Sequence, residues 1–580
     1  MCRLVVKHYN GNAHLHYNAT REKGRGAVIA TRVREEETES MAKTFGTFDY
    51  VIVGAGSAGC VLANRLSADP NASVLLLEAG AKDDWIWIHI PVGYLYCINN
   101  PRTDWCYHTE PDPGLNGRSI RYPRGKVLGG SSSINAMLYL RGQARDYDEW
   151  AQLTGDSGWA WRNVLPVFMQ LEDSWRGADE KHGAGGEWRV ETPRINWEIL
   201  EAFRDAAAEI GVPRIDDFNR GDNEGVSRFD VNQKNGVRWS ASRAFLRPAL
   251  KRPNLTVVTG ALVKKLRLEG RRVQGVEFYQ GSEECFAGAR RETILSAGAI
   301  GSPQVLQLSG VGPGGLLQRH GIPVAHDLPV GENLQDHLQL RMAFKVKNVV
   351  TLNAMLHSWW EKAKIGLEYA LFRTGPMTMP PSQMGAFVKS DPSQASANLE
   401  YHVQPISLDR FGDPPHRFPA FTASACNLRP TARGSVRIAS PDPRAYPAIQ
   451  CNYLSTPEDQ AVAVQALKLT RRIVLGTQAM QKYEPEEFTP GPQFQSEEKL
   501  LEAARAIGTT IFHPVGTCKM GRADDATAVV DPRFRVRGIE GLRVIDASIM
   551  PTITSGNTNS PTIMIAERGS ALVREDGTRS

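Results

Sequence analysis

The sequence FDYVIVGAGSAGCVLANRLSADPNASVLLLEAG, residues 48–80, decides the fold class. It opens with an apolar run, Tyr50–Val53, which is typical of a strand buried on both faces. Gly54, Gly56 and Gly59 follow at the G-x-G-x-x-G spacing. Glycines at this spacing allow a tight turn, the approach of the backbone to a pyrophosphate and close packing of the next helix. The stretch therefore predicts a phosphate-binding turn directly after a buried strand.

The residues after the glycines complete the same unit. Cys60–Ala68 has the pattern of a helix, and Val74–Leu77 has that of a second buried strand, which leads into Glu78. Glu78 lies roughly twenty residues past the glycines, where an acidic residue binds the ribose hydroxyls of an adenine dinucleotide. Residues 48–80 therefore predict a nucleotide-binding βαβ unit rather than a glycine-rich turn without a ligand.

Length and composition restrict the class of protein. At 580 residues the chain is too long for one simple core, so we expect two domains or one domain with a large insertion. Hydrophobic residues make up 41% and charged residues 23%, as in ordinary globular proteins. Lys and Arg number 68 against 63 Asp and Glu, without a dense basic block, so no nucleic-acid partner is implied. No apolar run approaches the roughly twenty residues of a transmembrane helix.

The eight cysteines are scattered and include no C-x-x-C pair. This distribution favours reduced thiols and a cytoplasmic protein over a disulfide framework. Cys97, Cys106 and His108 are close in sequence, but their spacing matches no zinc pattern, so we expect no metal site. Residues 1–46 are polar, mixed in charge and without the apolar core of a signal peptide. We expect them to be a disordered extension, with Met41 as the alternative start of the protein.

A second stretch rich in glycine and serine, RYPRGKVLGGSSSINAMLYLRG, occupies residues 121–142. Its small residues allow backbone amides to approach a ligand closely, and the pattern after them predicts a helix. Leu255–Tyr279 reads as successive strands. Thr293–Ser296 reads as a further short strand, followed by a helix that begins near Ser302 and Pro303.

The character of the sequence changes after Gly331. Proline-rich loops alternate there with strand-like runs such as Leu399–Val403, so we expect an inserted second domain built on an antiparallel sheet with helices. Near the C-terminus, Leu542–Ile545 predicts another buried strand, and Ser560 and Pro561 predict the N-cap and first position of a final helix. The N-terminus of such a helix favours negative charge in front of it.

Motifs from the whole chain together resemble the glucose–methanol–choline (GMC) family of FAD-dependent oxidoreductases. In order they are GAGSAG with Glu78, RGKVLGGSSSIN, SAGAIGSPQVLQLSGVGP, HPVGTCKMG and DASIMPTITSGNTNSPT, and they span Phe48 to about Val573. The resemblance implies an α/β fold in which a discontinuous Rossmann-like FAD-binding domain carries an inserted α+β substrate domain built on an antiparallel sheet. The implied FAD-binding parts are residues 47–190, 236–335 and 506–576, and the implied substrate-binding parts are residues 191–235 and 336–505.

The resemblance also assigns residues to FAD. Ile134 stands where some relatives attach the flavin through a histidine, so the FAD is expected to be held non-covalently. The backbone of Val263 is expected at the adenine. The full set of expected cofactor-binding residues is Gly54, Gly56, Ser57, Ala58, Gly59, Glu78, Ala79, Val127, Gly130, Ser131, Asn135, Ala136, Val263, Asp546, Ala547, Asn557, Asn559 and Pro561.

His513 in HPVGTCKMG and Asn557 in SGNTN match the catalytic pair of the family. Oxidising an alcohol requires removal of the hydroxyl proton while a hydride leaves the carbon for flavin N5. An imidazole has an ordinary pKa of about 6.5, so it can take up and release a proton near neutrality. The resemblance therefore implies His513 as the base, with Asn557 holding the alkoxide-like oxygen.

Two further residues concern the substrate. His402 lies near a position that carries a histidine in choline-oxidising relatives, so the resemblance implies that it lines the substrate pocket. Choline-specific relatives have a glutamate for the quaternary ammonium where Gln383 stands here. Without that carboxylate a cation gains little from the site. We therefore expect oxidation of a neutral, primary alcohol to the aldehyde rather than oxidation of choline.

The expected partners are this small-molecule alcohol and an electron acceptor. A dehydrogenase that passes electrons to a quinone or another carrier is favoured, and a quinone acceptor would bring the protein to a membrane surface. An oxidase that uses O2, and a hydroxynitrile lyase that keeps FAD without a redox step, are the alternatives.

Overall fold

The computed structural model describes residues 42–409 and 413–579. Residues 42–580 form one compact unit. The predicted disordered extension covers residues 1–46, and its part up to residue 41 lies outside the described residues. Strand β1 begins at Lys43, so residues 43–46 belong to a strand and not to the extension.

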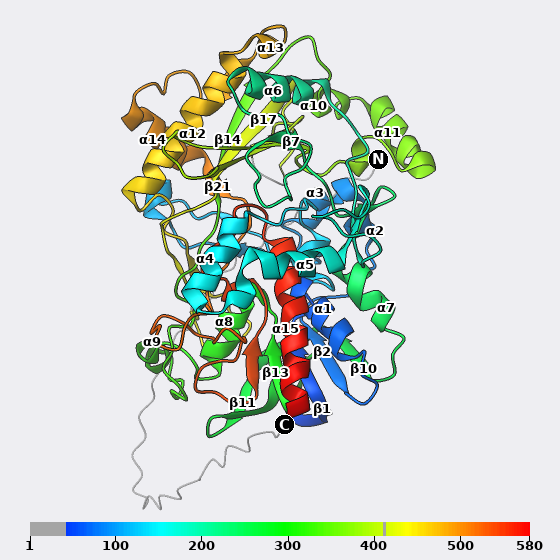
Figure 1. Ribbon diagram of the computed structural model, residues 1–580, viewed down its shortest axis with the longest axis vertical. Coiled ribbons are helices and arrows are strands. Elements are labelled where there is room, and N and C mark those ends of the chain that lie inside the picture. The colour runs from blue at the N-terminus through cyan, green and yellow to red at the C-terminus, as the bar shows by residue number, and fades with distance from the viewer. Residues whose placement is uncertain (1–41, 410–412, 580) are drawn as a thin grey trace, which may run out of the picture. The chain divides into compact units, whose positions relative to one another are not determined.

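The first of two seven-stranded sheets contains the glycine motif (Figure 1). Its strands are β10 (Leu255–Thr259), β2 (Val74–Glu78), β1 (Lys43–Val53), β13 (Glu283–Leu295), β12 (Arg272–Gln280) and β11 (Ala261–Glu269) in spatial order, with β22 (Leu542–Val544) beside β13. β10, β2, β1, β13 and β22 are parallel, whereas β12 and β11 are antiparallel. Parallel strands are normally covered on both faces, and the predicted runs Tyr50–Val53 and Val74–Leu77 are accordingly buried.

Three helices adjoin this sheet near the glycine motif: α1 (Ser57–Leu66), α8 (Gly298–Leu308) and α15 (Asn559–Arg579). α15 packs along α1, although the two helices come from opposite ends of the chain (Figure 1). Ser57 Oγ donates a 2.6 Å hydrogen bond to Asn559 Oδ1 at the point where both helices begin. α15 begins at Asn559, so Ser560 lies inside the helix instead of capping it.

The second seven-stranded sheet is antiparallel throughout. Its strands are β20 (Glu486–Thr489), β14 (Leu338–Lys345), β17 (Ala420–Asn427), β16 (Leu399–Gln404), β15 (Met384–Val388) and β7 (Gly225–Arg228) in spatial order, with β21 (Gly508–Thr510) beside β14. Apolar side chains of α6 (Glu198–Glu209), α12 (Pro457–Leu475) and α14 (Glu497–Ile507) form one core with this sheet.

The prediction of a helix directly after the glycines and serines of residues 121–142 is wrong. Only a single 3-10 turn forms, η3 (Gly130–Ser133). Gly129, Gly130 and Met137 have φ values of 88°, 52° and 63°, and such left-handed residues interrupt a right-handed helix. The next helix is α4 (Ala144–Thr154).

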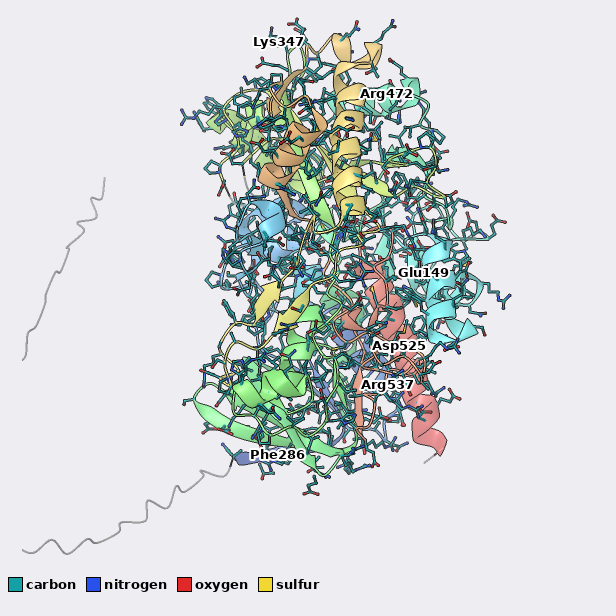
Figure 2. All side chains as sticks on the ribbon, turned by 90° about the vertical axis from the view of Figure 1, so that its left-hand side faces the viewer. Glu149, Phe286, Lys347, Arg472, Asp525 and Arg537 are labelled. Carbon is teal, nitrogen blue, oxygen red and sulfur yellow. The ribbon has the colours of Figure 1, made fainter. Side chains whose placement is uncertain are left out.

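Side chains fill the space between the backbone elements (Figure 2). Phe286 on β13 lies at the end of the unit that holds the first sheet, whereas Lys347, after β14, and Arg472, on α12, lie at the end that holds the second (Figure 2). The seven cysteines within the described residues are free thiols, as their spacing predicts. No helix in the described part of the chain is long and apolar enough to cross a membrane.

The remaining elements are short or lie outside the two sheets. They are α2 (Ile86–His89), η1 (Pro91–Gly93), α3 (Tyr94–Cys97), β3 (Tyr107–His108), η2 (Pro113–Leu115), β4 (Arg121–Tyr122), η4 (Ser157–Trp159), α5 (Trp161–Leu171), β5 (Glu172–Ser174), β6 (Trp188–Val190), β8 (Gln233–Lys234), β9 (Val237–Arg238), η5 (Ser242–Leu246), α7 (Arg247–Ala249), α9 (Gly314–Arg319), α10 (Leu352–Met355), α11 (Trp359–Phe372), η6 (Pro376–Thr378), β18 (Ser435–Arg437), β19 (Ala448–Gln450), α13 (Gln478–Gln481) and η7 (Ala547–Ile549).

Candidate active site

A large cavity is lined by residues from both sheets. It has a volume of about 270 Å³, close to the lower end of the roughly 300–1,000 Å³ of usual small-ligand pockets. Its wall includes the turn between β1 and α1, the end of β2, the start of α15, and residues 511–514 after β21. The cavity wall therefore connects the glycine turn with the segment that carries His513.

The turn between β1 and α1 has a backbone that only glycine permits. Gly54 has a φ of 97°, and a Cβ there would lie 2.7 Å from the carbonyl oxygen of Ser296. A Cβ on Gly59 would lie 1.9 Å from the carbonyl oxygen of Gly54. No side chain caps the first turn of α1, so its N–H groups remain available to an anion. This arrangement fits a pyrophosphate.

Glu78 and Asp546 are the carboxylates on the cavity wall within the described residues. Glu78 accepts hydrogen bonds from the backbone N–H groups of Ala55 (2.9 Å) and Gly80 (2.8 Å), and burial raises its pKa to about 7. Asp546 Oδ2 accepts a 2.6 Å hydrogen bond from Ser302 Oγ, and burial raises the pKa of this carboxyl as well. Each carboxylate is therefore fixed in place by its donors.

His513 and Asn557 meet on the cavity wall. Asn557 Nδ2 lies 3.0 Å from His513 Nε2, and the other ring nitrogen, Nδ1, lies 3.0 Å from Nδ1 of His337. Asn557 Oδ1 is buried and has no hydrogen-bond partner among the described residues. Burial, with further contributions from His337, His402 and Arg124, lowers the pKa of His513 well below its ordinary value. His513 is therefore a neutral imidazole at neutral pH.

A buried carboxylate holds the backbone of this histidine. The N–H of His513 donates a 2.8 Å hydrogen bond to Asp336 Oδ1. Asp336 Oδ2 accepts hydrogen bonds from the hydroxyls of Tyr122, Tyr453 and Thr510. Because the three hydroxyl donors come from β4, from the segment after β19 and from β21, Asp336 and the backbone of His513 are fixed beside the start of β14.

The wall around His513 is aromatic and positively charged. Tyr94, Trp105, Tyr107 and Phe512 line the cavity, and the guanidinium of Arg124 donates to the carbonyl oxygen of Phe512. The two carboxylates of the wall lie elsewhere, because they accept bonds from the turn after β1 and from α8. The acidic side chains of the wall therefore belong to the part of the cavity at the glycine turn and α8.

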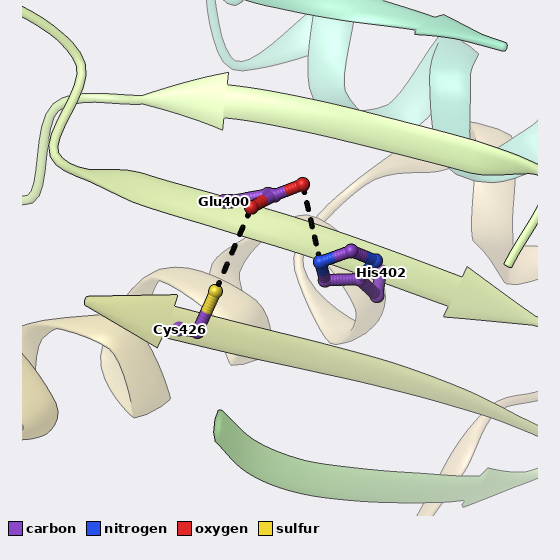
Figure 3. Close-up of side chains that lie close together, drawn as sticks. All are labelled: Glu400, His402 and Cys426. Carbon is purple, nitrogen blue, oxygen red and sulfur yellow. Dashed lines mark hydrogen bonds and ion pairs between the residues drawn. The ribbon is translucent and has the colours of Figure 1, made fainter. Parts of the chain in front are cut away.

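His402 lines the cavity from β16 and contacts a buried carboxylate behind it (Figure 3). His402 Nε2 lies 3.1 Å from Glu400 Oε1, and Cys426 Sγ lies 3.9 Å from Glu400 Oε2. Their ligand atoms lie within 4.8 Å of one another, so this is the one group of three potential metal ligands that the described residues provide. Burial and Glu400 raise the pKa of the Cys426 thiol far above its usual range, so this thiol stays protonated.

The structure brings most of the predicted site residues to this one cavity. The predicted residues on its wall are Gly54, Gly56, Ser57, Ala58, Glu78, Ala79, Gly130, Ser131, Asn135, Ala136, Val263, His402, His513, Asp546, Ala547, Asn557 and Asn559. Gly59, Val127, Pro561 and Gln383 are not among the lining residues. Gln383 is nevertheless buried, and both atoms of its amide have no partner among the described residues.

Sequence reasoning missed several residues of the site. Trp105 and Tyr107, at the start of the short strand β3, lie in a stretch without a recognisable sequence pattern, and Phe512 directly precedes the histidine of the motif. Residues 296–301 also line the cavity, although the motif SAGAIGSPQVLQLSGVGP that contains them indicates no particular ligand contact. His337 had no sequence signal, because its contact with His513 joins residues far apart in the chain.

The glycine turn and the pair His513–Asn557 on one cavity wall fit a nucleotide-dependent oxidoreductase. Family models of the GMC oxidoreductases match residues 48–339 and 430–566, and the chain belongs to this family. GMC oxidoreductases bind FAD, so the predicted family, the predicted class of FAD-dependent oxidoreductase and the predicted cofactor are confirmed.

Individual relatives cover nearly the whole chain. The oxygen-dependent choline dehydrogenase 1 of Chromohalobacter salexigens is 42% identical, over 91% of this chain and 95% of its own. The alcohol dehydrogenase [acceptor] of Pseudomonas putida is also 42% identical, with the same coverage of both chains. The crystal structure of pyridoxine 4-oxidase from Mesorbium loti superimposes with a TM-score of 0.82 at 32% identity, over 92% of this chain and 99% of its own.

Proposed function

We propose that this protein is an FAD-dependent dehydrogenase that oxidises a neutral primary alcohol to the aldehyde and passes the electrons to a quinone-like or artificial acceptor. The observation that carries the proposal is the pair His513–Asn557 on the wall of an aromatic cavity that continues to the glycine turn. The similarity to an alcohol dehydrogenase and to a choline dehydrogenase supports an alcohol as the substrate.

In this proposal FAD lies along the cavity and is held non-covalently. Gly54, Gly56 and the first turn of α1 would bind the pyrophosphate, Glu78 the ribose and Asp546 the flavin end. Ile134 supports non-covalent binding, because its side chain has no nucleophilic atom. The first sheet with α1, α8 and α15 would then be the discontinuous Rossmann-like domain, and the second sheet the inserted substrate domain, with the boundaries given above.

His513 Nε2 is the proposed base. Because the imidazole is neutral, it can accept the hydroxyl proton of the alcohol, and such a positioned base contributes on the order of 10²–10⁴ in rate. Asn557, 3.0 Å from Nε2, would hold the alcohol oxygen beside that nitrogen. Bound FAD supplies the acceptor for the hydride that leaves the carbinol carbon.

The charges on the wall support a neutral substrate. Arg124 lies close enough to His513 to lower its pKa, and a cationic alcohol would be repelled by the same guanidinium. The carboxylates on the wall are Glu78 and Asp546, which this proposal assigns to the FAD. His402 would add a polar contact for an uncharged hydroxyl compound.

The test is the bleaching of the oxidised flavin band by alcohols without air. Choline and 3,3-dimethylbutan-1-ol form a matched pair, because they have nearly the same shape and differ in charge. We expect bleaching by the neutral alcohol, and preferential bleaching by choline would contradict the proposed substrate. Slow return of the band in air, with fast return on addition of a quinone, would support the dehydrogenase.

Two other outcomes would point to the alternatives. Rapid reoxidation by air alone would identify an alcohol oxidase. If the protein retains FAD that no alcohol bleaches, and if it cleaves a cyanohydrin, it is a hydroxynitrile lyase.

A further inference from the structure

His337 contacts the proposed base from the side opposite the cavity. His337 is fully buried, and in the chain it stands between Asp336 and the first residue of β14. Its ring is nearly perpendicular to the ring of His513, with an interplanar angle of 84°. Its Nδ1 lies 3.0 Å from His513 Nδ1, and its Nε2 lies 3.1 Å from the carbonyl oxygen of Leu428.

The Leu428 carbonyl determines where the protons of both rings lie. A carbonyl oxygen only accepts hydrogen bonds, so His337 Nε2 must carry a proton and donate it. Burial lowers the pKa of His337, so this ring is neutral and has one N–H only. His337 Nδ1 is therefore an acceptor, and His513 Nδ1 must be the donor across the 3.0 Å contact.

The same reasoning fixes the second nitrogen of His513. Since the neutral ring of His513 already carries its proton on Nδ1, its Nε2 is unprotonated. Asn557 places the Nδ2 of its amide 3.0 Å from this nitrogen, and an amide N–H donates to a lone pair. The series of hydrogen bonds Leu428–His337–His513–Asn557 ends in the Leu428 carbonyl and the Asn557 amide, and both of these groups require the same placement of protons on the two rings.

We propose that His337 is a positioning residue that holds His513 in the Nδ1–H tautomer, so that Nε2 is free to take the proton of the alcohol. The inference deepens the proposed function and rests on it for the identity of the proton donor. When Nε2 takes up a proton, Nδ1–H stays bonded to His337, so the same contact orients the ring after the transfer. His337 would therefore support the base before and after the transfer.

A pair of substitutions at this position tests the inference. His337→Leu removes both ring nitrogens, whereas His337→Gln keeps an amide oxygen that can accept from His513 Nδ1 and an N–H that can donate to Leu428. We expect His337→Leu to lower the anaerobic bleaching rate per bound flavin roughly 10- to 100-fold at saturating alcohol, with little change in KM. We expect His337→Gln to return to within a few-fold of the unaltered enzyme and to restore its pH profile.

The content of bound FAD separates a positioning role from a merely structural one. A structural role would lower the FAD content or the melting temperature and leave the rate per bound flavin unchanged. That result with His337→Leu would overturn the inference, and so would a His337→Gln holoenzyme as slow as His337→Leu.

The tautomer itself has a readout that does not depend on activity. In ¹⁵N NMR spectra of holoenzyme labelled at histidine, with His513→Asn used for assignment, we expect a protonated Nδ1 and a bare Nε2 on His513. A protonated Nε2 would overturn the inference. If no alcohol bleaches the flavin but the spectrum shows the expected tautomer, the proposed function fails while the role of His337 as a tautomer-fixing residue stands.

Discussion

At the scale of single residues, the surroundings of His513 determine its chemistry. A histidine in water is partly protonated near neutrality, but here burial and the neighbouring His337, His402 and Arg124 depress its pKa. The protonated form is therefore populated only in acid. Activity that depends on a neutral base should fall only when the pH drops well below the ordinary histidine value of about 6.5.

Arg124 offers a direct test of this electrostatic effect. Replacing Arg124 by Met removes a positive neighbour, so the pKa of His513 should rise and the acid limb of the pH–rate profile should move to higher pH. Arg124→Lys keeps the charge and serves as the matched control. The measurement is the anaerobic bleaching rate between pH 5 and 9, and equal profiles for the Met variant and the unaltered enzyme would contradict the assignment.

The charge preference of the substrate should depend on Gln383. Its amide is buried without a hydrogen-bond partner among the described residues, and Gln383→Glu adds a carboxylate at the position where choline-specific relatives are expected to carry one. We expect the ratio of kcat/KM for choline to that for 3,3-dimethylbutan-1-ol to rise by at least about tenfold, which corresponds to about 1.4 kcal/mol. Gln383→Met should leave the ratio near its original value; a similar rise in both variants would assign the effect to packing instead of charge.

At the scale of elements, the join between β1 and α1 depends on backbone contact. Gly59→Ala would place a methyl group 1.9 Å from the carbonyl oxygen of Gly54, so α1 must move away from the strand. We expect protein that retains little FAD and melts at a lower temperature. Gly366→Ala is the control, because this helical glycine in α11 has open space around it and an alanine there should add roughly 0.5–1 kcal/mol of stability. Normal FAD content in Gly59→Ala would contradict the role of the close contact.

Elements with local signals could be predicted from the sequence, and those that depend on distant contacts could not. The glycines and Glu78 lie within one short stretch, so spacing alone places them on one turn and one strand end. The helix predicted after residues 121–133 fails because Met137 adopts a left-handed conformation, which no periodicity reveals. His337 was missed because its function depends on a contact with a ring 176 positions further along the chain.

At the scale of the whole molecule, buried ion pairs make the stability depend on pH. His182 is 1% exposed and lies 3.1 Å from Glu172 Oε2 and 2.8 Å from Asp217 Oδ2. These carboxylates raise its pKa from 6.5 to about 9, although burial alone would lower it. Because the pKa is higher in the folded state, the protonated imidazole of His182 stabilises the fold, by on the order of 3 kcal/mol. This contribution is fully present below pH 6.5 and is lost as the pH rises through 9.

The test compares thermal unfolding of the unaltered protein and His182→Gln at pH 6 and pH 9.5. We expect the difference between their free energies of unfolding to be larger at pH 6. His320→Gln is the control, since His320 has no ion-pair partner in the part of the chain that the structure describes. A difference that does not change with pH would show that His182 contributes through packing alone.

The hydrogen bond between Ser57 and Asn559 also has a consequence for biosynthesis. A ribosome makes the glycine turn early and α15 late, and the two must meet before the wall of the cavity is complete. Nascent chains that still lack α15 therefore expose the apolar face of α1, which other parts of a growing polypeptide or a chaperone must cover. GMC oxidoreductases bind FAD, and a cofactor that binds only the folded form stabilises it, so cells short of riboflavin should accumulate this protein in an incompletely closed, protease-sensitive form.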